Sequence, residues 1–185
     1  RDGYLTDIVK HALNERLQEL TEQVVPPFMS ASLRDGSFFL SKSKDATNGF
    51  VSCKQDNVIG GITALVAEME RARQHGFTQS EMDRAKAELM RWAEDTYAER
   101  NKERNGRYVR RCLSNFTDGE PLLSPEQELQ IVKRLDKSVT VEDVNRMVLE
   151  MISDKNQVVT LYGPDKDGFV LPTEEEIETA VLAAQ

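Results

Sequence analysis

One stretch near the middle of the chain decides most of the fold: Gly76-Phe77-Thr78-Gln79-Ser80-Glu81-Met82-Asp83-Arg84-Ala85-Lys86. Gly76 is well placed to end a helix in the left-handed conformation, since glycine adopts positive φ without a steric penalty. Two residues later, Thr78 and Glu81 have capping-box spacing, in which a hydroxyl and a carboxylate satisfy reciprocal backbone amides at a helix start. The stretch therefore predicts that one helix ends and a long second helix begins within a few residues.

The helices on either side of this junction have apolar residues at three- and four-residue steps. The upstream stripe is Ile59, Ile62, Val66 and Met69, and the downstream stripe is Met82, Ala85, Leu89, Trp92, Ala93 and Thr96. We expect Trp92 to be largely buried. The charged run at 99–104 and Asn105-Gly106 predict a break before the segment 108–116.

The residues before this pair of helices predict one more helix and a small sheet. Apolar residues recur on one helical face from Leu5 to Leu20, and Pro26-Pro27 closes that helix because proline lacks the required amide. Three short strands are predicted, at 28–33, 37–42 and 49–54. Asp35-Gly36 and Asn48-Gly49 tolerate positive φ, so an antiparallel meander is the simplest connection.

Downstream, three more signals mark helix starts. Ser124-Pro125-Glu126-Gln127 and Thr140-Val141-Glu142-Asp143 are capping boxes, and Val139 and Val144 have the spacing of a hydrophobic staple around the second one. Pro172 to Glu176 begins a last, acidic helix. The apolar run from Val158 to Tyr162 predicts a later strand. The fold class is therefore α+β, a mainly antiparallel sheet of about four strands (the three-strand meander plus one later strand) packed against several helices.

Composition excludes several classes of protein. The 185 residues include 24 basic and 32 acidic side chains, a net charge of −8, and 39% are hydrophobic, which describes one globular domain. A nucleic-acid binder or a basic membrane-surface helix would need a positive face. No stretch approaches the roughly 18 consecutive apolar residues of a spanning helix. Cys53 and Cys112 are too few for a disulfide framework, so we expect buried free thiols.

Signals for catalysis or metal binding are sparse. His11 and Glu15 lie four residues apart on one helix, but a hydrolytic zinc site usually needs three protein ligands, so an ordinary surface contact is favoured. His75 precedes Gly76 at a helix end, where it interacts favourably with the helix dipole. Nucleophile-elbow, phosphate-loop and dinucleotide motifs are absent. We therefore assign no catalytic, cofactor-binding or metal-binding residue.

Three other groups have a structural and a functional interpretation. Gly60-Gly61 near a helix start can expose amides to an anion, but a packing or turn role is favoured. Glu68 and Glu70, like the run from Glu174 to Glu178, are interpreted as solvated faces and not as acid/base pairs. The basic cluster at 104–111 is the chain's one positive patch, and internal ion pairing or a domain interface is favoured over nucleic-acid binding.

Four of these elements occur in a recognisable order: the helix ending at 13–20, then Pro26-Pro27-Phe28, then the stretch 76–86, then the helix start at 138–144. In this order they resemble a non-catalytic homologous domain of the pitrilysin/insulinase family of zinc metallopeptidases, over about Leu5 to Tyr162. The resemblance implies a parent of paired α+β domains that enclose a chamber in which unfolded peptides are cut. The family's zinc is held by His-x-x-Glu-His and a distal Glu, a motif absent here. The cofactor expected is therefore none in this fragment and zinc in the parent's catalytic domain.

A second departure from the family concerns Thr21 and Phe28. Active-side partner domains carry a Leu-Arg pair with a Tyr seven residues beyond the Arg, and these help to hold substrate near the zinc. Aligning Leu20-Thr21 with that pair places Thr21 at the Arg and Phe28 at the Tyr. A hydroxyl and an unsubstituted ring cannot supply the guanidinium and phenol donors that stabilise a developing oxyanion. The comparison implies the second domain of the catalytic half, turned away from the zinc.

We therefore expect residues 1–163 to form one non-catalytic peptidase-family domain and 164–185 to be a linker and acidic helix leading to the rest of the parent. The expected role is scaffold and wall of the peptide-enclosing chamber. Its partners would be the other homologous domains and the peptide substrate, without nucleic acid or membrane insertion. The alternatives are a standalone interaction module and an inactive homologue of the core-subunit type. Export of many bacterial relatives favours a periplasmic or cell-envelope parent.

Overall fold

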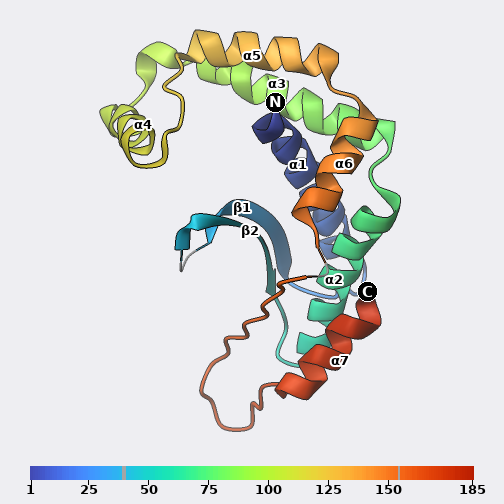
Figure 1. Ribbon diagram of the computed structural model, residues 1–185. Coiled ribbons are helices and arrows are strands. Elements are labelled where there is room, and N and C mark those ends of the chain that lie inside the picture. The colour runs from blue at the N-terminus through green and yellow to red at the C-terminus, as the bar shows by residue number, and fades with distance from the viewer. Residues whose placement is uncertain (39–40, 154) are drawn as a thin grey trace.

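The computed structural model describes residues 1–38, 41–153 and 155–185. Figure 1 shows their arrangement, which is mostly helical with one antiparallel hairpin and so confirms the α+β class. The elements are α1 (Asp2–Thr21), β1 (Ser30–Phe38), β2 (Ser41–Ser52), α2 (Val58–His75), α3 (Gln79–Ala98), the 3₁₀ turn η1 (Arg100–Lys102), α4 (Asn105–Asp118), α5 (Pro125–Ser138), α6 (Val141–Met151) and α7 (Glu174–Ala184).

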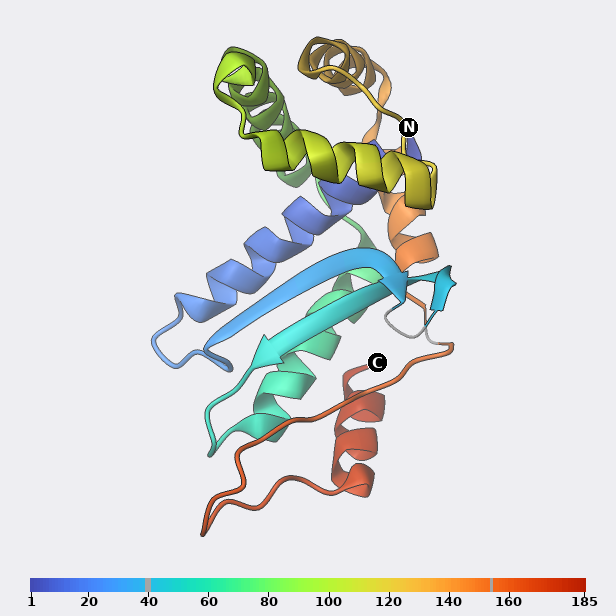
Figure 2. The same cartoon turned by 90° about the vertical axis from the view of Figure 1, so that its left-hand side faces the viewer.

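Helix α1 lies at the centre of the core and contacts β1, α2, α3 and α6. Its side chains Ile8, Leu13 and Leu17 are completely shielded from solvent. Figure 2 shows the hairpin lying across α1 and α2, which together cover one face of the sheet. Asn14 of α1 also receives a hydrogen bond from the Leu33 amide (2.7 Å) and donates one to its carbonyl (3.2 Å). Burial of the α1 stripe is therefore coupled to the position of β1.

The junction between α2 and α3 forms as the sequence predicts, with one difference in detail. Gly76 ends α2 with φ +68°, but its ψ of −158° is not the left-handed helical value. Thr78 and Glu81 form the predicted capping box. Asn145 of α6 accepts a hydrogen bond from the Phe77 amide (2.7 Å) and donates one to its carbonyl (3.2 Å). The chain between the two helices is therefore anchored to α6.

The later helix starts are confirmed. Ser124 and Thr140 each form a capping box, and Thr173 forms a third with Glu176 at the start of α7. Val139 and Val144 are both buried in the core, as a hydrophobic staple requires. The charged run after α3 forms η1 and separates α3 from α4, as expected.

The sheet differs from the predicted meander. β1 and β2 form a single long hairpin, the only pairing among the residues described, in which Gly36 lies opposite Ala46 and Asn48 opposite Arg34. The predicted turns at Asp35-Gly36 and Asn48-Gly49 are therefore not formed, because both pairs lie within the paired strands. A Cβ on Gly49 would lie 3.2 Å from the Leu65 side chain, so this glycine permits close packing of β2 on α2. The predicted middle strand at 37–42 includes residues 39 and 40, which lie outside the described residues.

The predicted strand from Val158 to Tyr162 has no strand partner among the described residues, and Tyr162 is 87% exposed. The apolar run of these residues is therefore not explained by burial within this chain. The segment leads to α7, which packs against α2 and buries Ala180. Gln74 also donates a hydrogen bond to the carbonyl of Gln185 (3.3 Å).

Two burial predictions on the α3 and α4 side of the molecule are wrong for this chain. Trp92 is 54% exposed, because Met82, Leu89 and Ala93 form the buried stripe of α3 and Trp92 lies beside it. Both thiols were expected to be buried, but Cys53 is only half-buried and Cys112 on α4 is exposed. None of the residues of α4 (Asn105–Asp118) is buried, and Figure 1 shows this helix set apart from the helical body.

Candidate functional site

The residues considered for a metal site do not come together. His11 is exposed on α1, and its neighbour Glu15 accepts a hydrogen bond from Nε of Arg84 (3.1 Å). His75 is exposed at the end of α2. Within 1–38, 41–153 and 155–185, no three His, Cys, Asp or Glu side chains are grouped as metal ligands. The described side chains therefore do not fit the zinc of the resemblance. Over the same residues, no helix combines the length and apolar character needed to cross a membrane.

The two positions compared with the substrate-gripping Arg and Tyr are engaged within the domain. The Thr21 hydroxyl donates to the Gln18 carbonyl (2.7 Å), so it bonds back to the last turn of its own helix. Phe28 has no solvent exposure and belongs to the main core. The Phe28 ring is therefore closed to a bound peptide, and the Thr21 hydroxyl already donates its hydrogen bond within α1.

Gly60-Gly61 is a site of close packing. A Cβ on Gly61 would lie 2.3 Å from the Cys53 sulfur and 3.4 Å from the Pro27 carbonyl oxygen. Asn57, which precedes α2, donates a side-chain hydrogen bond to the same Pro27 carbonyl (2.9 Å). The geometry favours the packing interpretation of this pair over an anion site.

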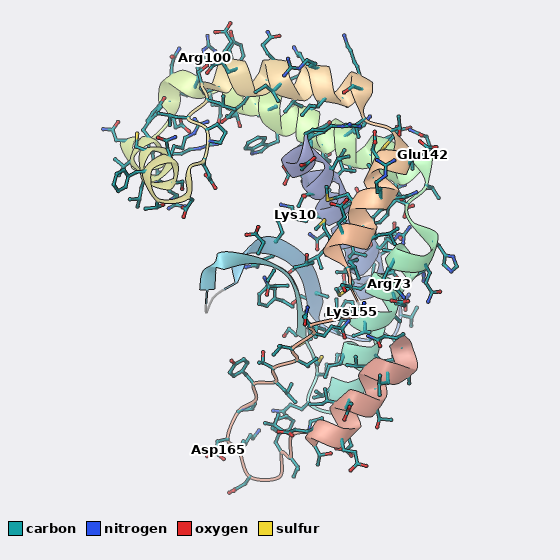
Figure 3. All side chains as sticks on the ribbon, viewed as in Figure 1. Lys10, Arg73, Arg100, Glu142, Lys155 and Asp165 are labelled. Carbon is teal, nitrogen blue, oxygen red and sulfur yellow. The ribbon has the colours of Figure 1, made fainter. Side chains whose placement is uncertain are left out.

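The interpretation of Glu68 and Glu70 as a solvated face is wrong, because both are buried on α2, with 4% and 8% exposure. Hydrogen bonds from Arg73 (2.6 and 2.7 Å) lower the pKa of Glu70 against the opposing effect of burial. Figure 3 shows Arg73 on α2. Glu68 lies between two guanidinium groups, 3.5 Å from Nη1 of Arg16 and 3.3 Å from Nη2 of Arg71. Each carboxylate is therefore an ion-pair partner and not a free acid or base.

Arg16 is the centre of a half-buried polar cluster that the sequence did not single out. Its Nε and Nη2 donate to the two oxygens of Glu81 (2.5 and 3.0 Å), and Nη2 also donates to the Gly76 carbonyl (3.0 Å). The guanidinium lies 4.5 Å from the ring centroid of Phe77. Burial raises the pKa of Glu81, but hydrogen bonds from Arg16 and Thr78 outweigh burial and lower it to about 2.

The rest of the 76–86 stretch also binds neighbouring helices. Lys86 donates from Nζ to the carbonyls of Asp136 (2.7 Å) and Val139 (2.8 Å) at the end of α5, where a cation is favourable. Arg84 pairs with Glu15 of α1. The 76–86 stretch, which carries part of the family resemblance, therefore supplies residues that join α3 to α1, α5 and α6.

The basic cluster forms one wall of a groove of about 760 Å³ between α3, α4 and α5. Arg107 pairs with Glu103 (2.6 Å) and Arg111 pairs with Glu128, as the internal ion-pairing interpretation predicts. The groove is lined by Trp92, Glu103, Arg104, Gly106, Arg107, Arg110, Arg111, Ser114, Glu120 and Glu128. Figure 3 shows Arg100 near the junction of α3 and α4, where its carbonyl accepts a hydrogen bond from Tyr108 (3.2 Å).

The opposite face of α4 is apolar and exposed. Val109, Leu113 and Phe116 follow helical spacing and are 66%, 58% and 88% exposed. At 100° per residue this stripe lies across the helix from Arg107 and Arg111, which line the groove. The helix therefore turns its basic face toward the body of the domain and its apolar face away from it.

Comparisons with known proteins confirm the resemblance of this chain to the pitrilysin/insulinase-like zinc metallopeptidases. The chain is similar to "Probable zinc protease PqqL" of Escherichia coli, with 33% identity over 95 residues, 51% of this chain and 10% of that protein. It is 26% identical over 146 residues to "Zinc protease PQQL-like" of Arabidopsis thaliana, 79% of this chain and 12% of that protein. The chain thus spans about a tenth of the curated relatives it matches. No protein-family model matches it.

Solved structures share the fold. The periplasmic protease PqqL from Escherichia coli matches 80% of this chain and 16% of its own, with a TM-score of 0.68 and 24% identity. A predicted insulinase family protease from Yersinia pestis matches 98% of this chain and 38% of its own, with a TM-score of 0.72 and 12% identity. The fold therefore recurs as one part of longer proteases.

Proposed function

We propose that this chain is a non-catalytic domain of a zinc metalloendopeptidase and that it forms scaffold and wall of a chamber that encloses unfolded peptides. The observation that carries the proposal is the engagement of Thr21 and Phe28, one bonded to its own helix and the other fully buried. These positions correspond to the donors that grip substrate in active-side domains of the family. Their engagement supports a structural role for this domain.

The zinc of such a parent would belong to another domain. Relatives carry the name zinc protease, and the side chains described here do not group as zinc ligands. A periplasmic location is proposed for a bacterial parent, since the similar PqqL of Escherichia coli is described as periplasmic. We also propose that residues 1–163 form one domain and that residues 164–185 are a linker and acidic helix leading to the rest of the parent.

The proposed partner surface is the apolar face of α4, defined by Val109, Leu113 and Phe116. An exposed apolar stripe on a helix that buries none of its own residues is energetically unfavourable in water and is typical of a surface that another protein covers. In a parent of several homologous domains, a neighbouring domain would cover it. The same face also fits a standalone interaction module, which is the second candidate.

The test uses the full-length parent with Leu113→Glu and Phe116→Glu together. We expect peptide hydrolysis to fall at least tenfold because charges on this face oppose domain packing, while zinc content stays unchanged. The matched control is Lys133→Gln with Arg134→Gln on the exposed face of α5, which changes the net charge by the same −2 and should leave hydrolysis unchanged. Full activity in the Leu113/Phe116 variant, with normal helical content, would overturn the proposed role of this face.

A further inference from the structure

We infer that the groove between α3, α4 and α5 binds extended, acidic peptide segments. The inference rests on the proposed function and adds the chemistry of the substrate that the chamber wall would contact. It concerns the basic face of α4, opposite the apolar stripe proposed as the domain interface.

The first observation is a local excess of positive charge. Residues 100–118 contain six basic and two acidic side chains, a net charge of +4 in a chain of −8. Arg107 and Arg111 are neutralised by Glu103 and Glu128. Arg104 and Arg110 also line the groove, are exposed, and have no ion-pair partner in the part of the chain that the structure describes. Of the lining carboxylates, Glu120 alone lacks an ion pair within the same residues.

The second observation is a buried carboxylate with unused hydrogen-bonding capacity. The Glu103 side chain is 6% exposed and lines the groove. It is charge-paired with Arg107 (2.6 Å), yet neither of its oxygens accepts a hydrogen bond of good geometry from the described residues. A ligand that supplies N–H donors would satisfy this carboxylate.

The third observation is the aromatic side chain at the α3 wall. Trp92 is 54% exposed and lines the groove, so its indole face is open to an apolar or aromatic side chain of a ligand. Trp92 was expected in the core. It instead lines the groove together with the arginines of α4.

Together these groups match an extended peptide and distinguish it from other anions. Backbone amides supply donors for Glu103, acidic side chains pair with Arg104 and Arg110, and an apolar side chain contacts Trp92. The backbone of a nucleic acid has phosphate oxygens but no amide donors, and the remaining chain of net −12 would repel it. An acidic, unfolded peptide segment is the ligand class that uses all three features.

The experiment measures binding of a fluorescent, unstructured peptide of Gly, Ser, Glu and Phe to the 185-residue chain by anisotropy. The comparison peptide carries Gln in place of every Glu. We expect the acidic peptide to bind about tenfold more tightly than the Gln peptide, with the difference decreasing as salt is raised. Arg104→Gln with Arg110→Gln should remove this difference. Lys133→Gln with Arg134→Gln, the same charge change on α5, should keep it. Trp92→Ala should weaken both peptides and keep the charge dependence.

Equal affinity for the two peptides would overturn the inference, as would an Arg104/Arg110 variant that binds like the control. Two further results would replace it with another occupant: displacement of the peptide by single-stranded DNA, or self-association of the chain that competes with the peptide. Each of these outcomes leaves the proposed role of the apolar α4 face standing, because that role is tested through Leu113 and Phe116 in the parent. Conversely, the chain could bind the acidic peptide while the Leu113/Phe116 change leaves hydrolysis by the parent unaffected. That result would support peptide binding in the groove and contradict the proposed role of the apolar α4 face.

Discussion

Arg16 of α1 and Glu81 of α3 are 65 positions apart in sequence and are joined by two hydrogen bonds, at 2.5 and 3.0 Å. Glu81 at the same time closes the capping box with the Thr78 amide (2.7 Å). One carboxylate therefore starts a helix and fixes that helix to the central one. The 76–86 stretch, which resembles the family sequence, therefore holds α3 against α1.

Removing the cation should be costly. Arg16→Gln leaves Glu81 without its cation and leaves the buried Glu68 with Arg71 alone, and breaking a buried ion pair from one side typically costs about 3 kcal/mol or more of unfolding free energy. Denaturant unfolding of the chain measures the loss. Arg84→Gln removes the 52% exposed partner of Glu15 and should cost less than about 1 kcal/mol. Equal losses in the two variants would contradict the central role of Arg16.

Stability should decrease as the solution becomes acidic. The pKa of Glu81 is lowered from 4.5 to about 2 in the folded chain, so its contribution is present above the unfolded value and is lost as pH falls through the folded one. The lowered pKa of Glu70 acts in the same direction. Unfolding monitored between about pH 5 and pH 2 should therefore show a declining free energy of unfolding. Glu81→Gln should make this decline shallower, and an unchanged slope in that variant would disprove the assignment.

The Thr21 and Phe28 positions permit a direct comparison with substrate-gripping domains. Thr21→Arg in the full-length parent should leave peptide hydrolysis nearly unchanged, because the residue is not proposed to reach a scissile carbonyl. Phe28→Tyr buries a hydroxyl in the core and should cost about 1–3 kcal/mol of unfolding free energy, with hydrolysis per folded molecule unchanged.

Removing one donor of the authentic Arg/Tyr pair elsewhere in the parent should lower turnover by about 10²-fold. A tenfold gain from the double change at Thr21 and Phe28 would instead place this domain opposite the zinc.

Gly76 should tolerate no side chain. Its φ is +68°, and a Cβ would lie 2.5 Å from the Asn145 side chain that anchors Phe77. Gly76→Ala should destabilise the chain by about 1–3 kcal/mol, measured by thermal or denaturant unfolding. Gly106→Ala is the matched control, since that position in α4 has open space around it and should gain about 0.5–1 kcal/mol. A neutral Gly76→Ala would show that neither the positive φ nor the nearby Asn145 side chain requires glycine at this position.

Local signals predicted the helices well because caps act within a few residues. Thr78, Ser124 and Thr140 each form the box that their spacing indicates. The three-strand meander was not confirmed: Asn48-Gly49 was expected to form a turn, but it lies within β2, where Gly49 packs against Leu65 of α2. The local sequence does not contain that contact. The prediction that Glu68 lies on a solvated face was wrong for the same reason, since its partner Arg16 lies on another helix.

The α4 region shows a further limit of local pattern. The amphipathic spacing of α4 was visible in the sequence, and the apolar face of such a helix is usually buried. Here Phe116 on that face is 88% exposed, and the basic face lies toward Glu128. The groove with Trp92 follows from that orientation. Only the arrangement of α3, α4 and α5 in space reveals it.

We predict that this domain carries no zinc chemistry of its own. The most direct measurement is the zinc content of the purified 185-residue chain after mild purification. We expect no stoichiometric zinc, because His11 is exposed and its neighbour Glu15 is bound to Arg84. One tightly held zinc per chain, abolished by His11→Ala, would contradict it.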